Sequence, residues 1–427
     1  MAASRVVIVG GGFGGLYAAR ALRGTPVQIT LIDQRNYHLF RPMLYQVATG
    51  LLSSDEIAAP LRGILSNQPN VEVLMDEVVG VDAANSLVRL KNRNVPYDFL
   101  ILATGIHYNY FGHDEWREIA TPLESLEGAD IVRTKVLAAL ERAENMAAAG
   151  NASADEIRRQ LTFAVVGGGT VGVEMAGTLA EMFHIALKRD FHHIDPGSAR
   201  ILLFEAGPRL LAAYREDLSQ DAQRHLEGLG VEVHTRTPVT AIDGSGLVAG
   251  GQTIPAATVI WGAGVLASPS AKWLGVPSDA SGRVIVSPDL SVPGHPEIFA
   301  IGDTAHVVAP ARNLIGIRSR EPMVLPGVAQ PAIQEGQYVA RIIRSRVTKG
   351  PAPAPFWYWD KGDLAIVGRT YAVADLRFVR FAGFPAWFVW AIVHVYFLVG
   401  FANRLFVLLQ WGVAFVTKRR RGCVLDQ

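Results

Sequence analysis

The chain of 427 residues contains one cysteine, Cys423, close to its end. A single thiol cannot build a disulfide framework, and it excludes catalysis by a redox-active pair of cysteines. Histidine is also sparse, with 11 residues, and the adjacent His192 and His193 have no partner at a metal-ligand spacing. We therefore expect no disulfide and no metal site.

An excess of charge is missing as well. Lysine and arginine total 40 and aspartate and glutamate total 39, so the formal net charge is +1. This balance gives no sign of a nucleic-acid partner, because such proteins carry a clustered excess of positive charge. The opening residues MAASRVV lead directly into an apolar run, without the regions of a signal peptide. The length alone predicts about two or three domains.

Two segments repeat one pattern, in which an apolar strand leads into a glycine-rich turn and then a helix. They are RVVIVGGGFGGLYAARAL (5–22) and LTFAVVGGGTVGVEMAGTL (161–179). In a G-x-G-x-x-G turn the first glycine allows a tight turn, the second lets a pyrophosphate approach the backbone, and the third lets helix and strand pack closely. The helix N-terminus offers N–H groups to the phosphates. These glycines are Gly10, Gly12 and Gly15 in the first segment and Gly167, Gly169 and Gly172 in the second.

Each repeat continues into a second strand that ends in an acid, Asp33 after VQITLI and Glu205 after ARILLF. Such a carboxylate can accept hydrogen bonds from a ribose 2′-OH, although it could also merely cap the strand. Because loop, helix, strand and acid occur together twice, we expect two dinucleotide sites. The strands YDFLILATG (97–105) and TVIWGAGV (258–265) also correspond, so the duplication extends beyond the glycine loops.

Three further segments shape the expected organisation. Residues 35–61 are rich in aromatic and apolar side chains but lack periodicity, which indicates a functional loop rather than disorder. Residues 141–160 are expected to end one helix, turn near Gly150 and begin another, at a junction between domains. Residues 329–347 are expected to form a helix.

The C-terminal part is apolar. Residues 384–416 contain one charged side chain, Arg404, and are followed by the basic sequence TKRRRG. Together with Trp387, Trp390 and Trp411, this composition predicts contact with a membrane rather than a buried core helix.

Two modes of membrane contact are open. Residues 384–402 are almost long enough to span a bilayer, but a span would place His394 near its middle. Two in-plane helices joined near Asn403 avoid this difficulty, with Arg404 and Lys418–Arg421 among anionic head groups. We expect the in-plane arrangement.

At this point the residues resemble a known family, the type II NADH dehydrogenases. These are single-subunit, non-proton-pumping NADH:quinone oxidoreductases with the two-dinucleotide-binding flavoprotein fold. The resemblance runs essentially from end to end. The segments that carry it are VVIVGGGFGGL, YHLFRPMLYQVATG, TFAVVGGGTVGVEMAG, ARILLFEAGPRLL, VIWGAGV, PEIFAIGDTA, PGVAQPAIQEGQYVA, YWDKGDLAIVGR and AWFVWAIVHVYFLVGFANRLFVLLQW.

The resemblance implies an α/β fold with two Rossmann-like dinucleotide-binding domains and a C-terminal membrane-anchoring helical segment. The FAD-binding domain would comprise 1–115 and 285–348, the NADH-binding domain 160–282, and the membrane-anchoring region 350–427. The implied activity is FAD-dependent oxidation of NADH with two-electron reduction of a membrane quinone, without proton pumping. The enzyme would be peripheral, on the cytoplasmic face of the inner (plasma) membrane, where residues 384–421 contact the lipid surface. The quinone and a homodimeric state stay open.

The resemblance also assigns the two nucleotides. The N-terminal loop would hold FAD, with Asp33 on the adenosine ribose and Asp303 of FAIGD on the ribitol chain. The central loop would hold NADH, with Glu205 on its ribose. A carboxylate there would repel the 2′-phosphate of NADPH, and Arg209, four residues on, is too far along to compensate. Other cofactor-binding residues expected are Phe13, Gly14, Asn36, Val79, Ala103, Thr104 and Gly105 for FAD and Gly264 for NADH.

Catalytic roles follow from the same resemblance. Glu174 would lie beside the flavin–nicotinamide stack, although it could also simply favour the helix dipole. Ala329 and Gln330 would lie against the isoalloxazine at the quinone pocket, with Gln334 one turn along. Lys361 would lie nearby and stabilise developing negative charge.

Two rival functions remain compatible with the sequence. One is a flavin-dependent NADH oxidoreductase with a soluble acceptor, and the other is a redox sensor that binds FAD and NADH. The apolar C-terminal segment disfavours the first, and the complete nucleotide sites disfavour the second. The chain departs from the family at Thr170 and Val171, where Pro-Thr is usual, and in the longer stretch 307–326, which could reshape the quinone entrance.

Overall fold

The computed structural model describes residues 3–188, 190–319, 321–417, 420 and 422–425. The chain forms two compact units, each assembled from three separate stretches of sequence. Unit 1 comprises Met1–Leu39, Ala58–His107 and Val265–Lys361, and unit 2 comprises Phe40–Ile57, Tyr108–Gly264 and Gly362–Gln427.

A six-stranded sheet in the order β21-β22-β9-β1-β2-β5 forms the centre of unit 1. Neighbouring strands run parallel, except that β21 is antiparallel to β22. The inner strands are short apolar runs, which is typical of parallel strands buried on both faces. The bounds are β1 Ser4–Val9, β2 Val27–Asp33, β5 Val71–Met75, β9 Phe99–Leu102, β21 Ser291–Val292 and β22 His295–Ala300.

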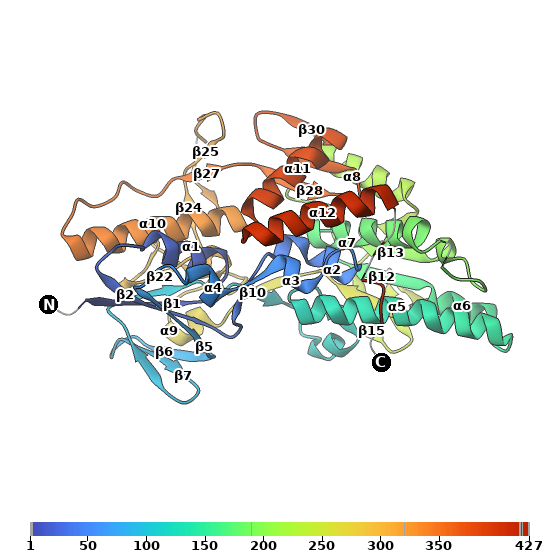
Figure 1. Ribbon diagram of the computed structural model, residues 1–427, viewed down its shortest axis with the longest axis horizontal. Coiled ribbons are helices and arrows are strands. Elements are labelled where there is room, and N and C mark those ends of the chain that lie inside the picture. The colour runs from blue at the N-terminus through green and yellow to red at the C-terminus, as the bar shows by residue number, and fades with distance from the viewer. Residues whose placement is uncertain (1–2, 189, 320, 418–419, 421, 426–427) are drawn as a thin grey trace. The chain divides into compact units, whose positions relative to one another are not determined.

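Helices cover one face of this sheet. In Figure 1, α1 (Phe13–Ala21) and α10 (Ala329–Thr348) lie above it, and the antiparallel meander β6 (Val78–Asp82), β7 (Leu87–Leu90) and β8 (Asn94–Pro96) lies below. The two helices approach closely through glycine, because a Cβ on Gly336 would lie only 2.3 Å from the Gly14 carbonyl oxygen. The helix predicted over 329–347 is confirmed and ends one residue later.

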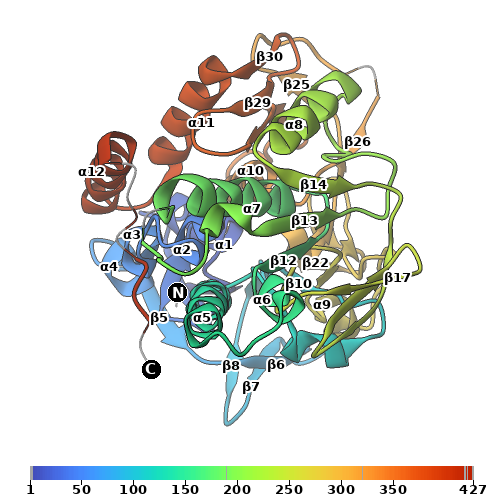
Figure 2. The same cartoon turned by 90° about the vertical axis from the view of Figure 1, so that its right-hand side faces the viewer.

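Unit 2 repeats this plan. Its sheet has the order β11-β18-β12-β13-β14, and all neighbours are parallel. Figure 2 shows α5 and α7 on one side of β12–β14 and β17 on the other. The strands are β11 Ala120–Pro122, β12 Thr162–Val166, β13 Arg200–Phe204, β14 Val231–His234 and β18 Thr258–Trp261, with the meander β15 Val239–Asp243, β16 Gly246–Ala249 and β17 Gln252–Pro255. The helices are α5 Leu126–Ala149, α6 Ala154–Gln160, α7 Thr170–Glu181 and α8 Glu216–Gly228.

The duplication expected from the sequence is confirmed in the strand order. The run β9-β1-β2-β5 in unit 1 corresponds to β18-β12-β13-β14 in unit 2, and each glycine loop follows the strand second in that run. Each sheet has a three-stranded meander inserted before its β9 or β18 strand. The prediction of two Rossmann-like sheets is therefore correct, as is the turn near Gly150 between α5 and α6. The expected domain junction at this turn is wrong, because both helices belong to unit 2.

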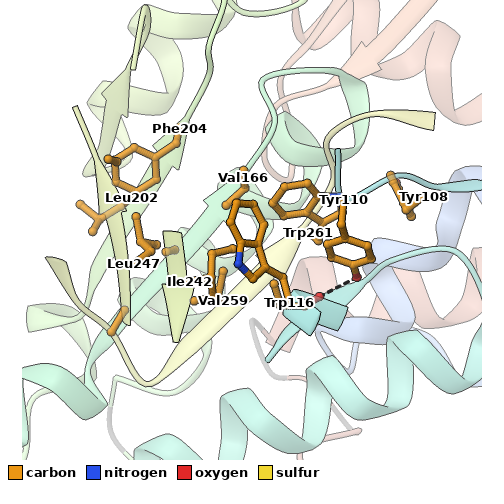
Figure 3. Packing of buried hydrophobic residues seen from close by; sticks show 14 residues of the cluster. Tyr108, Tyr110, Trp116, Val166, Leu202, Phe204, Ile242, Leu247, Val259 and Trp261 are labelled. Carbon is orange, nitrogen blue, oxygen red and sulfur yellow. Dashed lines mark hydrogen bonds between the residues drawn. The ribbon is translucent and has the colours of Figure 1, made fainter. Parts of the chain in front are cut away.

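An aromatic cluster fixes the end of β18 in unit 2 (Figure 3). The rings of Tyr110 and Trp261 stack at 4.8 Å, and both side chains are fully buried. The Tyr110 hydroxyl donates to the Ala120 carbonyl at 2.8 Å, and the indole N–H of Trp261 donates to the Asn109 carbonyl at 3.2 Å. The polar atoms of both rings therefore have hydrogen-bond partners. Gly262, directly after Trp261, lies beside Gly167 of the central glycine loop.

The segment 35–61, predicted to be an irregular loop, instead forms a series of short elements. They are β3 Tyr37–Leu39, α2 Leu44–Ala48, α3 Ser54–Ile57 and β4 Ala58–Pro60, followed by α4 Leu61–Leu65. All five residues of α2 are buried. An element of five residues or fewer shows no repeat of a helical or strand period, which is why the pattern was invisible in the sequence.

The C-terminal part of unit 2 begins with an antiparallel sheet of β28 (Asp363–Ile366), β29 (Ala372–Asp375) and β30 (Arg380–Gly383). Helix α11 (Phe384–Phe397) follows at once, and α12 (Phe401–Thr417) comes after a three-residue break. The predicted joint near Asn403 is therefore wrong by a few residues. Gly400 has φ +97°, which ends the helical path, and Asn403 already lies in the first turn of α12.

Within the described part of the chain, no helix combines the length and apolarity that a bilayer span requires. Two expectations for this region need correction. Trp390 is 1% exposed and stacks on His394 at 4.1 Å, so it belongs to the core rather than to an exposed aromatic belt. The guanidinium of Arg420 donates to the carbonyls of Thr49 and Thr178 at 2.9 and 3.0 Å, so it is not directed to head groups. Lys418, Arg419 and Arg421 lie outside the described residues.

Candidate functional site

The glycine loop of unit 1 leaves open space where a ligand can approach. Gly10 turns the chain with φ +103°, and a Cβ on Gly15 would lie 1.9 Å from the Gly10 carbonyl oxygen, so both positions require glycine. A Cβ on Gly12, by contrast, would meet no protein atom within 4 Å. Gly12 is the N-cap of α1 and no side chain caps that end. The first N–H groups of α1 therefore face a gap that suits a phosphate.

The loop of unit 2 repeats this geometry closely. Gly167 has φ +108°, and a Cβ on Gly172 would lie 1.8 Å from the Gly167 carbonyl oxygen. Gly169 is the N-cap of α7, has no side-chain cap, and would place a Cβ in open space. The two loops thus share a tight turn, a close helix–strand contact and a helix N-terminus without a side-chain cap.

The two acids hold their loops through backbone N–H groups. Asp33 accepts from Gly11 at 2.6 Å and from Arg35 at 2.7 Å. Glu205 accepts from Gly168 at 2.6 Å and from Gly207 at 2.6 Å. Burial raises the pKa of Asp33 above its ordinary value, against the lowering effect of its two N–H donors. Each acid is therefore fixed beside the glycine that lies between the first two glycines of its motif, Gly11 for Asp33 and Gly168 for Glu205.

The side chain of Arg209 is committed to the protein. Its guanidinium donates to the carbonyls of Tyr214 and Ala212, both at 2.7 Å, and more weakly to that of Leu211 at 3.4 Å. These bonds fix the segment that follows Glu205. A 2′-phosphate would have to compete with three carbonyls for this cation.

Glu174 lies on α7, directly after the central glycine loop, and is 6% exposed. Its Oε1 accepts a long hydrogen bond of 3.5 Å from the N–H of Ile366. Burial raises the pKa of Glu174 well above its usual value, against the lowering effect of the Ile366 N–H. The residue is therefore a buried carboxyl on the same helix that begins at the glycine loop.

In unit 1, Thr104 and Gly105, which follow β9, form hydrogen bonds with serine and threonine hydroxyls. The Thr104 hydroxyl contacts those of Ser268, Ser270 and Thr304, with oxygen separations of 3.0 Å to Ser270 and 3.1 Å to Thr304. The N–H of Gly105 donates to the Thr304 hydroxyl at 2.9 Å. Gly105 has φ +70° and open space where a Cβ would be.

The turn before Asp303 depends on a buried acid that sequence reasoning missed. Glu335 on α10 is 1% exposed and accepts from the N–H of Gly302 at 2.5 Å. Burial raises the pKa of Glu335 to about 8, so this carboxyl is protonated near neutral pH. The bond fixes the turn in which Gly302 adopts φ +63° and thereby places Asp303.

Gln334 connects the helix that carries Gln330 to the strand that precedes Lys361. The Gln334 amide donates to the Trp359 carbonyl at 3.0 Å and accepts from the Trp359 N–H at 2.9 Å. It therefore joins α10 to β27 (Tyr358–Asp360) through both of its amide atoms. The Oε1 atom of Gln330 is buried and has no partner among the described residues. Burial lowers the pKa of Lys361.

The remaining expected residues have mixed surroundings. Gly14 packs against α10, since a Cβ there would lie 3.1 Å from Ile301. Phe13 meets the ring of His38 edge-on at 5.0 Å. Asn36 is exposed, Val79 is 49% exposed on β6, and a Cβ on Gly264 would lie 2.4 Å from Phe111. The last contact shows that Gly264 is required for packing in unit 2.

Unit 2 also contains a large apolar cavity of about 740 Å³. Helices α11 and α12 supply most of its lining, including the exposed side chains Phe388, Ile392 and Tyr396. Polar side chains in its lining include those of Glu181 on α7 and of Arg369, whose backbone N–H donates to the Glu181 carboxylate at 2.5 Å. The volume falls in the usual range for small-molecule sites, about 300–1,000 Å³.

Sequence reasoning did not find this cavity. Tyr45 and Gln46 of α2 line it, and Gln46 accepts from the indole N–H of Trp411 at 2.8 Å. These residues come from parts of the chain more than 300 residues apart, and no motif links them. Two turns of α7 separate Glu181, at the cavity, from Glu174.

Comparison with known proteins agrees with this geometry. The sequence profile of the pyridine nucleotide-disulphide oxidoreductase family matches residues 4–336. The chain is 42% identical to the type II NADH:quinone oxidoreductase Ndh of Mycobacterium tuberculosis, over 97% of this chain and 89% of the relative. It is 40% identical to NdhA of the same organism, over 97% of this chain and 88% of the relative.

The fold is similar to that of solved structures. NDH2 from Plasmodium falciparum in complex with NADH superposes with a TM-score of 0.84, at 22% identity, over 96% of this chain and 98% of the other. The sulfide:quinone oxidoreductase of Aquifex aeolicus gives a TM-score of 0.71 at 20% identity, over 93% of this chain and 91% of the other. At these identities the likeness concerns the fold.

Proposed function

Because the chain belongs to the pyridine nucleotide-disulphide oxidoreductase family and, within it, to the type II NADH:quinone oxidoreductases, we propose that it oxidises NADH with bound FAD and reduces a membrane quinone, without pumping protons. The observation that carries the proposal is that the same site geometry occurs twice. Each of two glycine loops leads into a helix whose N-terminus has no side-chain cap, and in each a carboxylate accepts from the N–H of Gly11 or Gly168. With Cys423 as the one cysteine, the chemistry does not use a cysteine pair.

FAD is assigned to unit 1, and the expected domain of residues 1–115 and 285–348 is retained as part of the proposal. The open space at Gly12, the open space at Gly105 and the unpartnered buried Oε1 of Gln330 suit a large polar cofactor. Asp33 would bind the adenosine ribose and Asp303 the ribitol chain. When bound, FAD supplies two-electron transfer between NADH and quinone.

NADH is assigned to unit 2, within the expected domain 160–282, with its pyrophosphate at the N-terminus of α7 and its ribose on Glu205. Two features support preference for NADH over NADPH. The Glu205 carboxylate repels a 2′-phosphate, and Arg209 is engaged with backbone carbonyls. Glu174, a buried carboxyl on the helix that begins at this loop, would lie near the nicotinamide.

Replacing Glu205 with glutamine is expected to relax the preference for NADH over NADPH by about 1–3 kcal/mol in kcat/KM, because the charge that repels the 2′-phosphate is removed. The NADH value should fall as well, since an amide nitrogen would then face the N–H of Gly168 or Gly207. Steady-state reduction of a short-chain quinone with each cofactor measures both effects. Equal use of NADH and NADPH by the wild type would show that Glu205 does not set the preference.

The quinone ring is proposed to bind in unit 1. Gln330 and Lys361 would bind its ring oxygens and stabilise developing negative charge, and Gln334 holds β27, the strand that Lys361 follows. The apolar cavity of unit 2 has a volume and a lining that suit an isoprenoid chain. Its lining is apolar apart from a few polar side chains such as Glu181 and Arg369.

Membrane attachment is proposed to be in-plane, through α11 and α12 on the cytoplasmic face of the inner membrane. Both helices are too short to span, and they expose large apolar side chains such as Phe388, Phe401 and Val416. An enzyme with a soluble acceptor would gain nothing from this apolar surface, so that rival function is less well supported. The two complete nucleotide sites likewise favour an enzyme over a redox sensor.

A further inference from the structure

Unit 1 contains a rigid hairpin whose tip is apolar and exposed. The hairpin begins with β25 (Ala311–Asn313) and returns through Ile317 and Arg318. In Figure 1 the loop at β25 projects beyond α10, while β25 itself pairs with β27. The sequence predicted only that the long stretch 307–326 could reshape the quinone entrance, and the proposed function does not use this tip.

The tip exposes aliphatic side chains that its turn does not require. Ile315 is 60% exposed and Ile317 is 62% exposed, and Leu314 beside them is 36% exposed. The turn itself needs Asn313, which bonds across it, and Gly316, which has φ +84°. Small polar residues would serve equally at the intervening positions. Exposed aliphatic side chains gathered at one protruding point indicate a contact surface.

Hydrogen bonds prevent the tip from folding back to bury these side chains. The N–H of Asn313 donates to the Ile317 carbonyl at 2.9 Å, and the N–H of Gly316 donates to the Asn313 carbonyl at 3.0 Å. The N–H of Ile317 donates to the Asn313 side chain at 2.9 Å. The isoleucines are thus presented outward by a fixed backbone.

Tryptophan and basic side chains surround the tip. Trp357, just before β27, and Trp359, within it, are 39% and 41% exposed, while Tyr358 between them is buried. The guanidinium of Arg318 lies 5.0 Å from the Trp357 ring centre, and the ammonium of Lys361 lies 5.4 Å from that of Trp359. An aliphatic tip with a border of tryptophan and cations is the composition of a membrane interface.

We propose that this hairpin is a second membrane-contact surface, which inserts Ile315 and Ile317 into an anionic bilayer with Arg318 at the head groups. The cations favour an anionic lipid surface over a neutral one. The proposal rests on the proposed function in so far as that places the enzyme on a membrane. It differs in assigning contact to unit 1 as well as to α11 and α12.

Fluorescence of a probe at the tip tests this directly. The full-length flavoprotein would carry Cys423→Ser and one new labelled cysteine, at Ile315, at Phe401 on α12, or at Asn85 in the exposed β6–β7 turn. Each labelled protein is mixed with phosphatidylcholine–phosphatidylglycerol vesicles, with and without nitroxide-bearing acyl chains. We expect the labels at 315 and 401 to shift to the blue and to be quenched by the nitroxide, and the label at 85 to do neither.

The possible outcomes distinguish membrane contact by the hairpin from attachment by α12. Shielding at 401 without shielding at 315 would overturn the hairpin proposal and leave attachment by α12 intact. Shielding at 315 but not at 401 would support the hairpin and contradict attachment by α12. Shielding at neither position would overturn both. A blue shift at 315 that grows with protein concentration in the absence of vesicles would identify a second copy as the occupant and overturn the proposal.

A substitution gives an independent check. Ile315→Glu is expected to weaken binding to anionic vesicles about tenfold, because a charged group replaces apolar surface that would enter the lipid. Ile131→Glu is the matched control, since Ile131 is also an exposed isoleucine, at 41%, and lies on α5. Equal vesicle binding by the two variants would contradict the proposal. NADH oxidation with ferricyanide should be unchanged in both.

Discussion

Replacing Gly172 with alanine is expected to lower kcat/KM for NADH about 100-fold while FAD stays bound, because a displacement of about 1 Å at a binding loop can cost that much. The added Cβ would lie 1.8 Å from the Gly167 carbonyl oxygen, so α7 must move away from β12. Overpacking of this kind costs about 1–3 kcal/mol of stability. The measurements are stopped-flow reduction by NADH, the flavin absorbance of the purified protein and its melting temperature.

Substitutions at two other glycines distinguish an effect on packing from an effect on the space available to the ligand. Neither Gly169 nor Gly228 would place a Cβ within 4 Å of a protein atom. Gly169→Ala should keep the wild-type melting temperature but bind NADH more weakly, because its methyl group enters the space for the pyrophosphate. Gly228→Ala, at the end of α8, should change neither property. Unchanged NADH affinity in Gly169→Ala would show that the pyrophosphate does not bind at this loop.

The second large effect is expected on activity toward a membrane quinone when charges are introduced on α12. Phe406 and Leu409 of α12 are 53% and 55% exposed, and neither lines the apolar cavity. The double variant Phe406→Glu, Leu409→Glu should lose at least about tenfold in activity toward a long-chain quinone in vesicles, because two charges would replace apolar surface at the acyl boundary. Activity with NADH and ferricyanide in solution should be unchanged.

A control adds the same charges elsewhere. Ser66→Glu, Asn85→Glu places them at exposed positions of unit 1 away from α12 in sequence and should keep both activities. If the α12 variant retained full activity with the long-chain quinone, attachment through this helix would be wrong. Loss of ferricyanide activity as well would indicate a damaged fold instead.

The nucleotide loops could be predicted from the sequence because their geometry is local. A buried parallel strand reads as an apolar run, and a turn with φ above +100° at Gly10 and Gly167 requires glycine. The same reasoning placed Asp33 and Glu205 at strand ends, where they meet the loops. Each of these features depends on fewer than about 40 consecutive residues.

The parts that could not be predicted depend on distant segments. Gln334 bonds to Trp359, a contact that no motif indicated. Arg420 bonds to Thr49 and Thr178, so its side chain does not have the head-group environment that the basic sequence indicated. A long polar side chain can reach several backbone carbonyls, and only the tertiary structure decides which it finds. The apolar cavity is likewise assembled from residues between Tyr45 and Arg420.

Anaerobic reduction of the bound flavin tests the central claim most directly. The account predicts that stoichiometric NADH bleaches the flavin absorbance of the purified protein, and that adding a short-chain quinone under the same conditions restores it completely. NADPH should bleach it far more slowly. A flavin that NADH reduces but quinone does not reoxidise would contradict quinone reduction, and a purified protein without bound flavin would contradict the assignment of FAD to unit 1.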